Sequence, residues 1–259
     1  MPRFSANLSL LYTEHDFMSR FAAARADGFK AVEFQFPYTF DKLDLAEKIR
    51  SEALELVLFN LPVGDWSAGD RGIACHPRRI GEFQDGVGLA IDYARALGCP
   101  RVNCLAGIKP TDESEARVRE TLIENLRFAA FALQRAGIEL VMEPVNNRDN
   151  PGFFVTTTRF ALALIEESGS DNLRLQYDLY HAQVMEGDLA VTLAENLPRI
   201  GHIQLADNPG RHEPGTGEIN FPFLFRQLDS LGYKGWVGCE YLPLGNTTDG
   251  LLSWLEAWR

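Results

Sequence analysis

Four side chains with oxygen donors end four strand-like runs in the second half of the sequence. They are Glu143, Asp178, Gln204 and Glu240, in the segments VMEP, QYDL, HIQLAD and VGCEY. Their separations of 35, 26 and 36 residues each suit one strand plus one helix, so parallel strands would bring the four side chains to one mouth. Carboxylates this close repel one another unless a cation lies between them. The pattern therefore predicts a divalent-metal site.

The donor types indicate which ion and which reaction to expect. An all-oxygen set suits Mg2+, Mn2+ or Ca2+, whereas zinc prefers more nitrogen or sulfur. A cation bound to a hydroxyl and a neighbouring carbonyl acidifies the C–H between them and stabilises the resulting enediolate. One carboxylate can then remove the proton and a second can return it elsewhere, and Glu143 and Glu240 are the candidates for this exchange. Taken singly, each of the four residues is also compatible with a solvated charge or a helix cap.

Segments near two of these strand ends carry candidate substrate-binding residues. His181 follows Asp178 by three positions, so we expect it above the end of that strand, unless it only caps the next helix. Arg211 and His212 lie in the segment 207–220, which is rich in glycine and proline. Both could hold a substrate carboxylate, with a plain solvated turn as the alternative.

The segment 60–79 (NLPVGDWSAGDRGIACHPRR) is long for a connection between a strand and a helix. Its Trp66 and Arg71 suggest a lid that contacts the substrate and excludes water from the enediolate.

Short β-prone runs alternate with helix-like stretches along the whole chain. The predicted strands are 4–10, 31–36, 54–60, 101–105, 138–144, 173–179, 202–207 and 235–241. Helices are predicted over 79–97 and 114–135, where apolar residues recur every three or four positions. Glycines that suit left-handed helix ends follow several helical stretches, namely Gly28, Gly98, Gly137, Gly169 and Gly232.

This alternation predicts an α/β fold, a (β/α)8 TIM barrel that forms a single domain over 1–259. The alternative is a doubly wound open sheet, but the first strand is not followed by a GxGxxG phosphate loop. Alternation along the strands places Val141, Gln176, His202 and Gly238 on the inward face, one layer below the four oxygen donors. Asn7, Glu33 and Asn103 are further polar candidates for the interior.

Composition limits the class of partner. A formal charge of −11 disfavours nucleic acid, and no run approaches the roughly 18 apolar residues of a membrane span. Four cysteines without a CxxC pair, and a start unlike a signal peptide, indicate a cytoplasmic protein. Trp254 and Trp258 in the last helix either pack internally or contact a second copy, so a homo-oligomer stays open.

The sequence resembles the hydroxypyruvate isomerase family within the xylose-isomerase-like TIM barrels. The matching stretches span nearly the whole chain and include RFSANLS, NLPVGDWSAGDRGIAC, VMEPVN, QYDLYH, HIQLADNPGRHEPGTGEIN and GWVGCEY. The resemblance implies a divalent metal and interconversion of hydroxypyruvate with tartronate semialdehyde, so the expected partner is a small hydroxy-oxo acid. It also implies that Glu143 and Glu240 are the acid/base residues, and that Glu143, Asp178, Gln204 and Glu240 are the metal ligands.

Three alternatives remain beside this resemblance. Related members act on 2-oxo-tetronates, and the motifs do not separate these substrates. Ketose 3-epimerases of the same superfamily look similar at the two glutamates, but usually have histidine where Gln204 stands. A non-catalytic binder of a sugar acid is the third. Barrels of the endonuclease IV type use more histidines than the five present here and are disfavoured.

Overall fold

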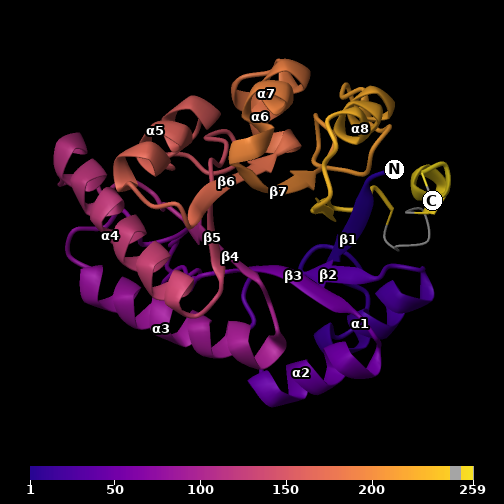
Figure 1. Ribbon diagram of the computed structural model, residues 1–259, viewed down its shortest axis with the longest axis horizontal. Helices are drawn as coiled ribbons and strands as arrows, with labels where there is room; N and C mark the ends of the chain where they lie inside the picture. The colour runs from indigo at the N-terminus through magenta and orange to yellow at the C-terminus, as the bar shows by residue number, and fades with distance from the viewer. Residues whose placement is uncertain (246–251, 259) are drawn as a thin grey trace.

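A closed barrel of eight parallel strands occupies the centre of the computed structural model, which describes residues 1–245 and 252–258 (Figure 1). Each strand pairs with the next along the chain, and the last pairs with the first. The strands are β1 (Arg3–Asn7), β2 (Ala31–Glu33), β3 (Glu55–Asn60), β4 (Arg101–Leu105), β5 (Glu139–Glu143), β6 (Leu173–Asp178), β7 (Ile200–Leu205) and β8 (Trp236–Cys239). The predicted (β/α)8 barrel is confirmed.

Helices surround the barrel and connect its strands (Figure 1). They are α1 (Phe17–Ala26), α2 (Lys42–Ser51), α3 (Ile80–Leu97), α4 (Glu115–Arg135), α5 (Thr158–Ser168), α6 (Leu179–Met185), α7 (Leu189–Asn196), α8 (Phe221–Ser230) and α9 (Leu252–Glu256). The β6–β7 connection departs from one helix per strand, because it contains α6, α7 and a 3-10 turn, Leu197–Arg199.

The two helices predicted in detail begin one residue later than expected. Ser114 stands just outside α4 as its cap, where its side chain accepts the N–H of Arg117. Gly98 ends α3 and Gly169 ends α5 in the left-handed conformation, as the glycine pattern predicted.

Six strands end earlier than the sequence suggested, and β1 and β2 differ the most. β1 ends at Asn7 because the chain turns there, with the N–H of Ser9 donating to Asn7 Oδ1 at 3.0 Å. β2 similarly ends at Glu33. The polar residues that follow the strands therefore belong to the mouth of the barrel.

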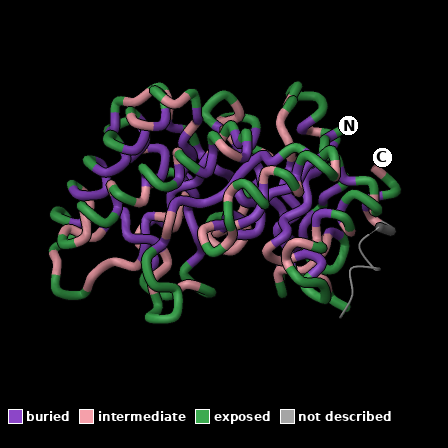
Figure 2. The backbone as a smooth tube through the Cα atoms, turned by 90° about the horizontal axis from the view of Figure 1, so that it is seen from below, coloured by how far each residue is buried: buried purple, intermediate pink, exposed green. Residues whose placement is uncertain are grey.

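Buried residues run through the middle of the fold and exposed residues cover its outside (Figure 2). The main apolar core lies between strands and helices, and Trp254 packs into it against Phe4 with ring centroids 5.3 Å apart. Within the described residues, no helix is both long and apolar enough to cross a membrane.

The inside of the barrel changes from apolar to polar along its axis. Val141 packs in a small separate cluster with Ala31, Val57 and Leu58. In the polar layer, His202 Nε2 lies 2.8 Å from Glu33 Oε2. Since β2 and β7 are not neighbours, this contact crosses the interior, as the inward placement of His202 predicted.

Candidate active site

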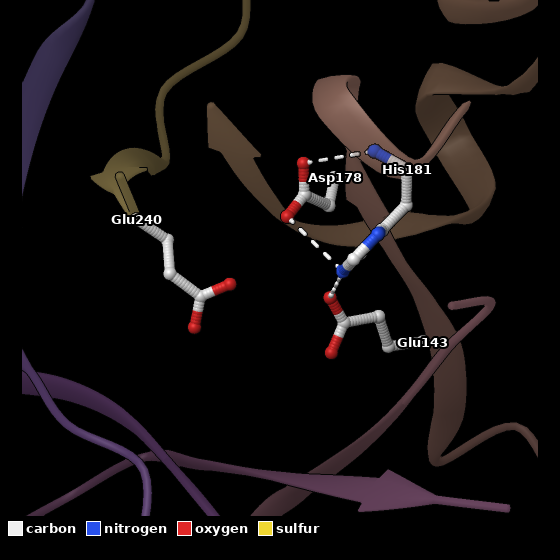
Figure 3. Close-up of side chains that lie close together, drawn as sticks. All are labelled: Glu143, Asp178, His181 and Glu240. Carbon is white, nitrogen blue, oxygen red and sulfur yellow. Dashed lines mark hydrogen bonds and ion pairs between the residues drawn. The ribbon is translucent and has the colours of Figure 1, made fainter. Parts of the chain in front are cut away.

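Three of the four predicted oxygen donors meet at the carboxyl ends of the strands. Glu143 ends β5, Asp178 ends β6 and Glu240 directly follows β8. His181, in the first turn of α6, joins them, and one potential ligand atom from each of the four lies within 4.8 Å of the others. Figure 3 shows the Glu240 carboxylate facing the other three side chains across the site. All four residues are buried.

Gln204 lies next to this cluster, in register with Asp178 on the neighbouring strand. Its amide nitrogen donates to Glu33 Oε1 at 2.7 Å, and its amide oxygen accepts from Gln176 Nε2 at 2.5 Å. The oxygen that would bind a cation is therefore engaged by Gln176 in this arrangement. The ligand role of Gln204 stays a prediction, and it would use the second lone pair of this oxygen.

The carboxylates of the cluster fit a hard divalent cation. Glu143 Oε1 and Asp178 Oδ2 are buried and have no hydrogen-bond partner among the described residues, which is unusual for buried oxygens. Burial, together with Glu240 and Asp178, raises the pKa of Glu143 well above its usual range. Burial likewise raises the pKa of Asp178 to about 7 and that of Glu240 above its ordinary value. A bound cation would give the partnerless oxygens a ligand to contact and would offset the repulsion between the ionised carboxylates. The cluster could therefore hold a metal ion.

His181 is better suited to donate a hydrogen bond than to bind a metal. Its Nδ1 lies 2.7 Å from Asn146 Nδ2, whose orientation is set because Asn146 Oδ1 accepts the N–H of Asp149. Nδ1 must therefore accept, which leaves the proton on Nε2. Burial and nearby Arg211 lower the pKa of His181 well below its usual value, so the ring is neutral. Its Nε2–H lies 3.7 Å from Glu143 Oε1 and 3.8 Å from Asp178 Oδ2.

Arg211 supplies a positive charge next to the acidic cluster. Its Nη2 lies 2.7 Å from Glu240 Oε2 and 4.0 Å from Asp178 Oδ2. Burial alone would lower its pKa, but the neighbouring carboxylates outweigh burial and raise it. Arg211 therefore stays charged and partly balances the acids.

The loop that carries Arg211 is organised by one side chain. The Asp207 carboxylate accepts the backbone N–H groups of Asn208, Gly215, Gly217 and Ile219. His212 turns away from the acids, with its Nδ1 2.7 Å from the carbonyl oxygen of Leu242. The structure thus brings Arg211 to the cluster but does not bring His212 there.

A small pocket opens beside the acids, with about 430 Å³ of free space including its open mouth. Its lining combines the carboxylates Glu143 and Glu240 with polar, apolar and basic side chains: Gln35, Asn60, Asn150, His181, Phe36, Leu105, Val145, Phe153, Trp66, Arg71 and Arg211. A few polar and charged groups that converge on one pocket are typical of small-molecule sites.

The segment 60–79 reaches this pocket through Trp66 and Arg71. The Trp66 side chain is 49% exposed, and its ring lies 5.7 Å from that of Phe36. The segment is anchored at Gly72, where a Cβ would lie only 2.4 Å from the carbonyl oxygen of Leu105. Trp66 and Arg71 therefore lie at the predicted place, while closure as a lid stays a prediction.

Amide side chains hold the two glutamates. Asn103 Nδ2 donates to Glu143 Oε2 at 3.0 Å, and Asn7 Nδ2 donates to Glu240 Oε1 at 3.0 Å. The sequence suggested both asparagines as interior residues, but missed Gln35, which donates to Glu240 Oε1 at 3.1 Å. Gln35 lies two positions after Glu33, the last residue of β2, and this alternate spacing along the predicted strand 31–36 was the signal that could have identified it.

Comparisons with known proteins identify the family of this chain. A model of the xylose isomerase-like TIM barrel family matches residues 21–258. A hydroxypyruvate isomerase from Escherichia coli (strain K12) is 52% identical over 259 residues, which cover 100% of both chains. A 2-oxo-tetronate isomerase from Cupriavidus necator is 48% identical over 256 residues, covering 99% of this chain and 98% of that one.

Solved structures share the barrel. A crystal structure titled AP endonuclease, family 2, from Brucella melitensis superposes with a TM-score of 0.97 at 44% identity, covering 100% of both chains. A D-allulose 3-epimerase from Methylomonas sp. has a TM-score of 0.76 at 20% identity and covers 100% of this chain and 92% of its own. At that identity the likeness shows a common fold alone.

Proposed function

Since the chain belongs to the xylose isomerase-like TIM barrel family and is an isomerase, we propose that it interconverts hydroxypyruvate and tartronate semialdehyde, or a related 2-oxo-tetronate, through an enediolate. One observation carries the chemistry: two buried glutamates, Glu143 and Glu240, face each other across one small pocket. The relatives named for these two substrate types support the substrate class.

The surroundings of the two glutamates favour the exchange of protons. Their raised pKa values bring the neutral and ionised forms closer in free energy, as acid/base catalysis requires. Asn103 holds Glu143 Oε2 and leaves Oε1 without a hydrogen-bond partner among the described residues. We assign Glu143 as the base that removes a proton from C3 of hydroxypyruvate and Glu240 as the acid that delivers a proton to C2, while the proton of the C3 hydroxyl passes to the C2 oxygen.

Neighbouring side chains orient and stabilise the reacting group. The Nε2–H of neutral His181 can donate to a substrate oxygen beside Glu143 and Asp178. The positive charge of Arg211 offsets the negative charge that develops in the enediolate. Trp66 stands at the edge of the pocket, where it limits the access of water.

The proposed metal site uses Glu143, Asp178 and Glu240, with Gln204 as the fourth expected ligand. A bound Mg2+, Mn2+ or Ca2+ would polarise the substrate carbonyl and hydroxyl and so acidify the C–H between them. Each glutamate has two carboxylate oxygens, so one can contact a cation while the other exchanges a proton.

Exchange of the substrate C–H with solvent deuterium tests these roles directly. We expect Glu143→Gln and Glu240→Gln to abolish exchange and turnover, whereas Glu120→Gln, on an exposed face, leaves both unchanged. Exchange that persists in both active-site variants would remove the two glutamates from acid/base roles.

Product analysis by NMR separates this isomerisation from epimerisation. A carbonyl that moves between C2 and C3 of a hydroxy-oxo acid supports the proposal. An inverted C3 with an unmoved carbonyl would instead identify a ketose 3-epimerase.

A further inference from the structure

The two arginines that line the pocket differ in their partners. Arg211 is paired with Glu240 and lies near Asp178, so its charge is directed to the acidic cluster. Arg71 makes no ion pair within residues 1–245 or 252–258. A positive charge with no counterion in a binding pocket suggests an anionic ligand.

Neutral groups hold the Arg71 guanidinium in place. Its Nη1 donates to the carbonyl oxygens of Asp70 at 2.8 Å and Trp66 at 3.3 Å. The guanidinium also lies 3.8 Å from the centroid of the Trp66 ring. The group is thus oriented without loss of its charge.

This arrangement leaves one edge of the guanidinium free. Nε and Nη2 point along the same edge, and neither donates a hydrogen bond within the part of the chain that the structure describes. Two parallel N–H groups at this spacing match the two oxygens of a carboxylate.

The acid next to Arg71 in the sequence does not neutralise it. The Asp70 carboxylate accepts from Arg79 Nη1 at 2.8 Å and from the N–H of Asp65 at 2.7 Å. Among the residues that line the pocket, His181 is neutral and Arg211 is engaged, so Arg71 is the cation left for a substrate.

We propose that Arg71 binds the substrate carboxylate through Nε and Nη2, and so selects hydroxy-oxo acids over uncharged sugars of the same length. This inference rests on the proposed function. It gives the carboxylate to Arg71 instead of Arg211 or His212, so that C2 and C3 of the substrate lie at the acidic cluster while C1 extends to the wall formed by the segment 60–79.

A matched pair of substrates tests the selection. Dihydroxyacetone differs from hydroxypyruvate by a hydroxymethyl group in place of the carboxylate. We expect Arg71→Gln to lower kcat/KM for hydroxypyruvate about 10- to 100-fold, since a charge-assisted hydrogen bond is lost. The value for dihydroxyacetone should stay within about twofold. Arg71→Lys keeps the positive charge but not the two parallel N–H groups, so its kcat/KM for hydroxypyruvate should lie between those of wild-type protein and Arg71→Gln.

Arg78→Gln is the control, because Arg78 belongs to the same segment but is 72% exposed and pairs with Asp112 at 2.8 Å. It should leave both substrates unaffected. An equal fall on both substrates in Arg71→Gln would indicate a structural role and overturn the inference, as would no fall on either.

Binding of an unreactive acid separates this inference from the proposed function. We expect glycerate to bind wild-type protein more tightly than glycerol does, and Arg71→Gln to remove that preference, as measured by calorimetry. If wild-type protein turns over no hydroxy-oxo acid, the proposed function fails, while glycerate binding still tests Arg71. If Arg71→Gln does not fold by circular dichroism, Arg71→Lys provides the same comparison, and unchanged glycerate affinity in that variant contradicts the bidentate contact.

Discussion

Glu33 Oε1 accepts a hydrogen bond from Gln204 Nε2 at 2.7 Å in the interior of the barrel. Burial alone would raise the pKa of Glu33, but His202 and the other donors outweigh burial and lower it, so the carboxylate is ionised. An ionised carboxylate can only accept hydrogen bonds, so the amide nitrogen of Gln204 must face it. Glu33 thereby determines which way the Gln204 amide is turned, next to the acidic cluster.

Glu33→Gln should destabilise the protein and weaken cation binding. The change leaves His202 without its anionic partner and allows the Gln204 amide to reverse, since glutamine both donates and accepts. We expect a loss of about 3 kcal/mol in the free energy of unfolding, measured in urea. Calorimetry with Mn2+ should show lower affinity. Glu47→Gln, on the exposed face of α2, is the control, and equal values for both variants would contradict the role of Glu33.

Gly238→Ala should destabilise the barrel next to Glu33. A Cβ at position 238 would lie 2.3 Å from Glu33 Oε1, a contact that the packed interior cannot relieve cheaply. We expect a loss of about 1 to 3 kcal/mol in the free energy of unfolding. Gly88→Ala in α3 is the matched control, because nothing lies within 4 Å of its Cβ position. That change should stabilise the helix by roughly 0.5 to 1 kcal/mol, and a similar gain at position 238 would contradict the crowding.

The contribution of Asp178 to the stability of the metal-free protein should fall as the pH rises from about 4 to about 7. The pKa of Asp178 is raised from 3.8 to about 7 in the folded chain, so between these values the folded state binds more protons than the unfolded state. The part of the free energy of unfolding that Asp178 supplies then falls with rising pH, by at most about 1.4 kcal/mol per pH unit, and levels off above pH 7.

Asp178→Asn isolates this effect, because asparagine cannot titrate. Urea unfolding of both proteins in EDTA, from pH 4 to pH 8, should show wild-type protein losing stability relative to the variant over this range. A constant difference between the two curves would show that the pKa of Asp178 is not raised.

Removal of divalent ions should lower both activity and thermal stability. A cation that binds only the folded state stabilises it by about 2.7 kcal/mol at 100 times its dissociation constant. We expect EDTA to lower the melting temperature of wild-type protein, and Mg2+, Mn2+ or Ca2+ to restore it. Asp178→Asn should respond weakly to the same ions. Recovery with Zn2+ alone would contradict the proposed preference for hard ions.

Local patterns in the sequence were enough to predict the barrel and much of its mouth. Alternating strands and helices, with glycines such as Gly98 and Gly169 at helix ends, depend on interactions between near neighbours and can be recognised in one chain. Parallel strands place their carboxyl ends together, and this rule predicted that Glu143, Asp178 and Glu240 would lie close to one another.

The directions of side chains and their partners were decided only by the tertiary structure. Gln204 and Gln176 share a hydrogen bond because β6 and β7 pair in one register, and His181 is turned by Asn146 from another loop. Arg211 meets Glu240 because the barrel brings their two loops together, whereas Arg71 has no ion-pair partner among the residues that the structure describes. Sequence determined which residues reach the mouth of the barrel, because strand ends are local features. Folding determined which charges were neutralised there, because electrostatic pairing depends on distances that only the closed barrel sets.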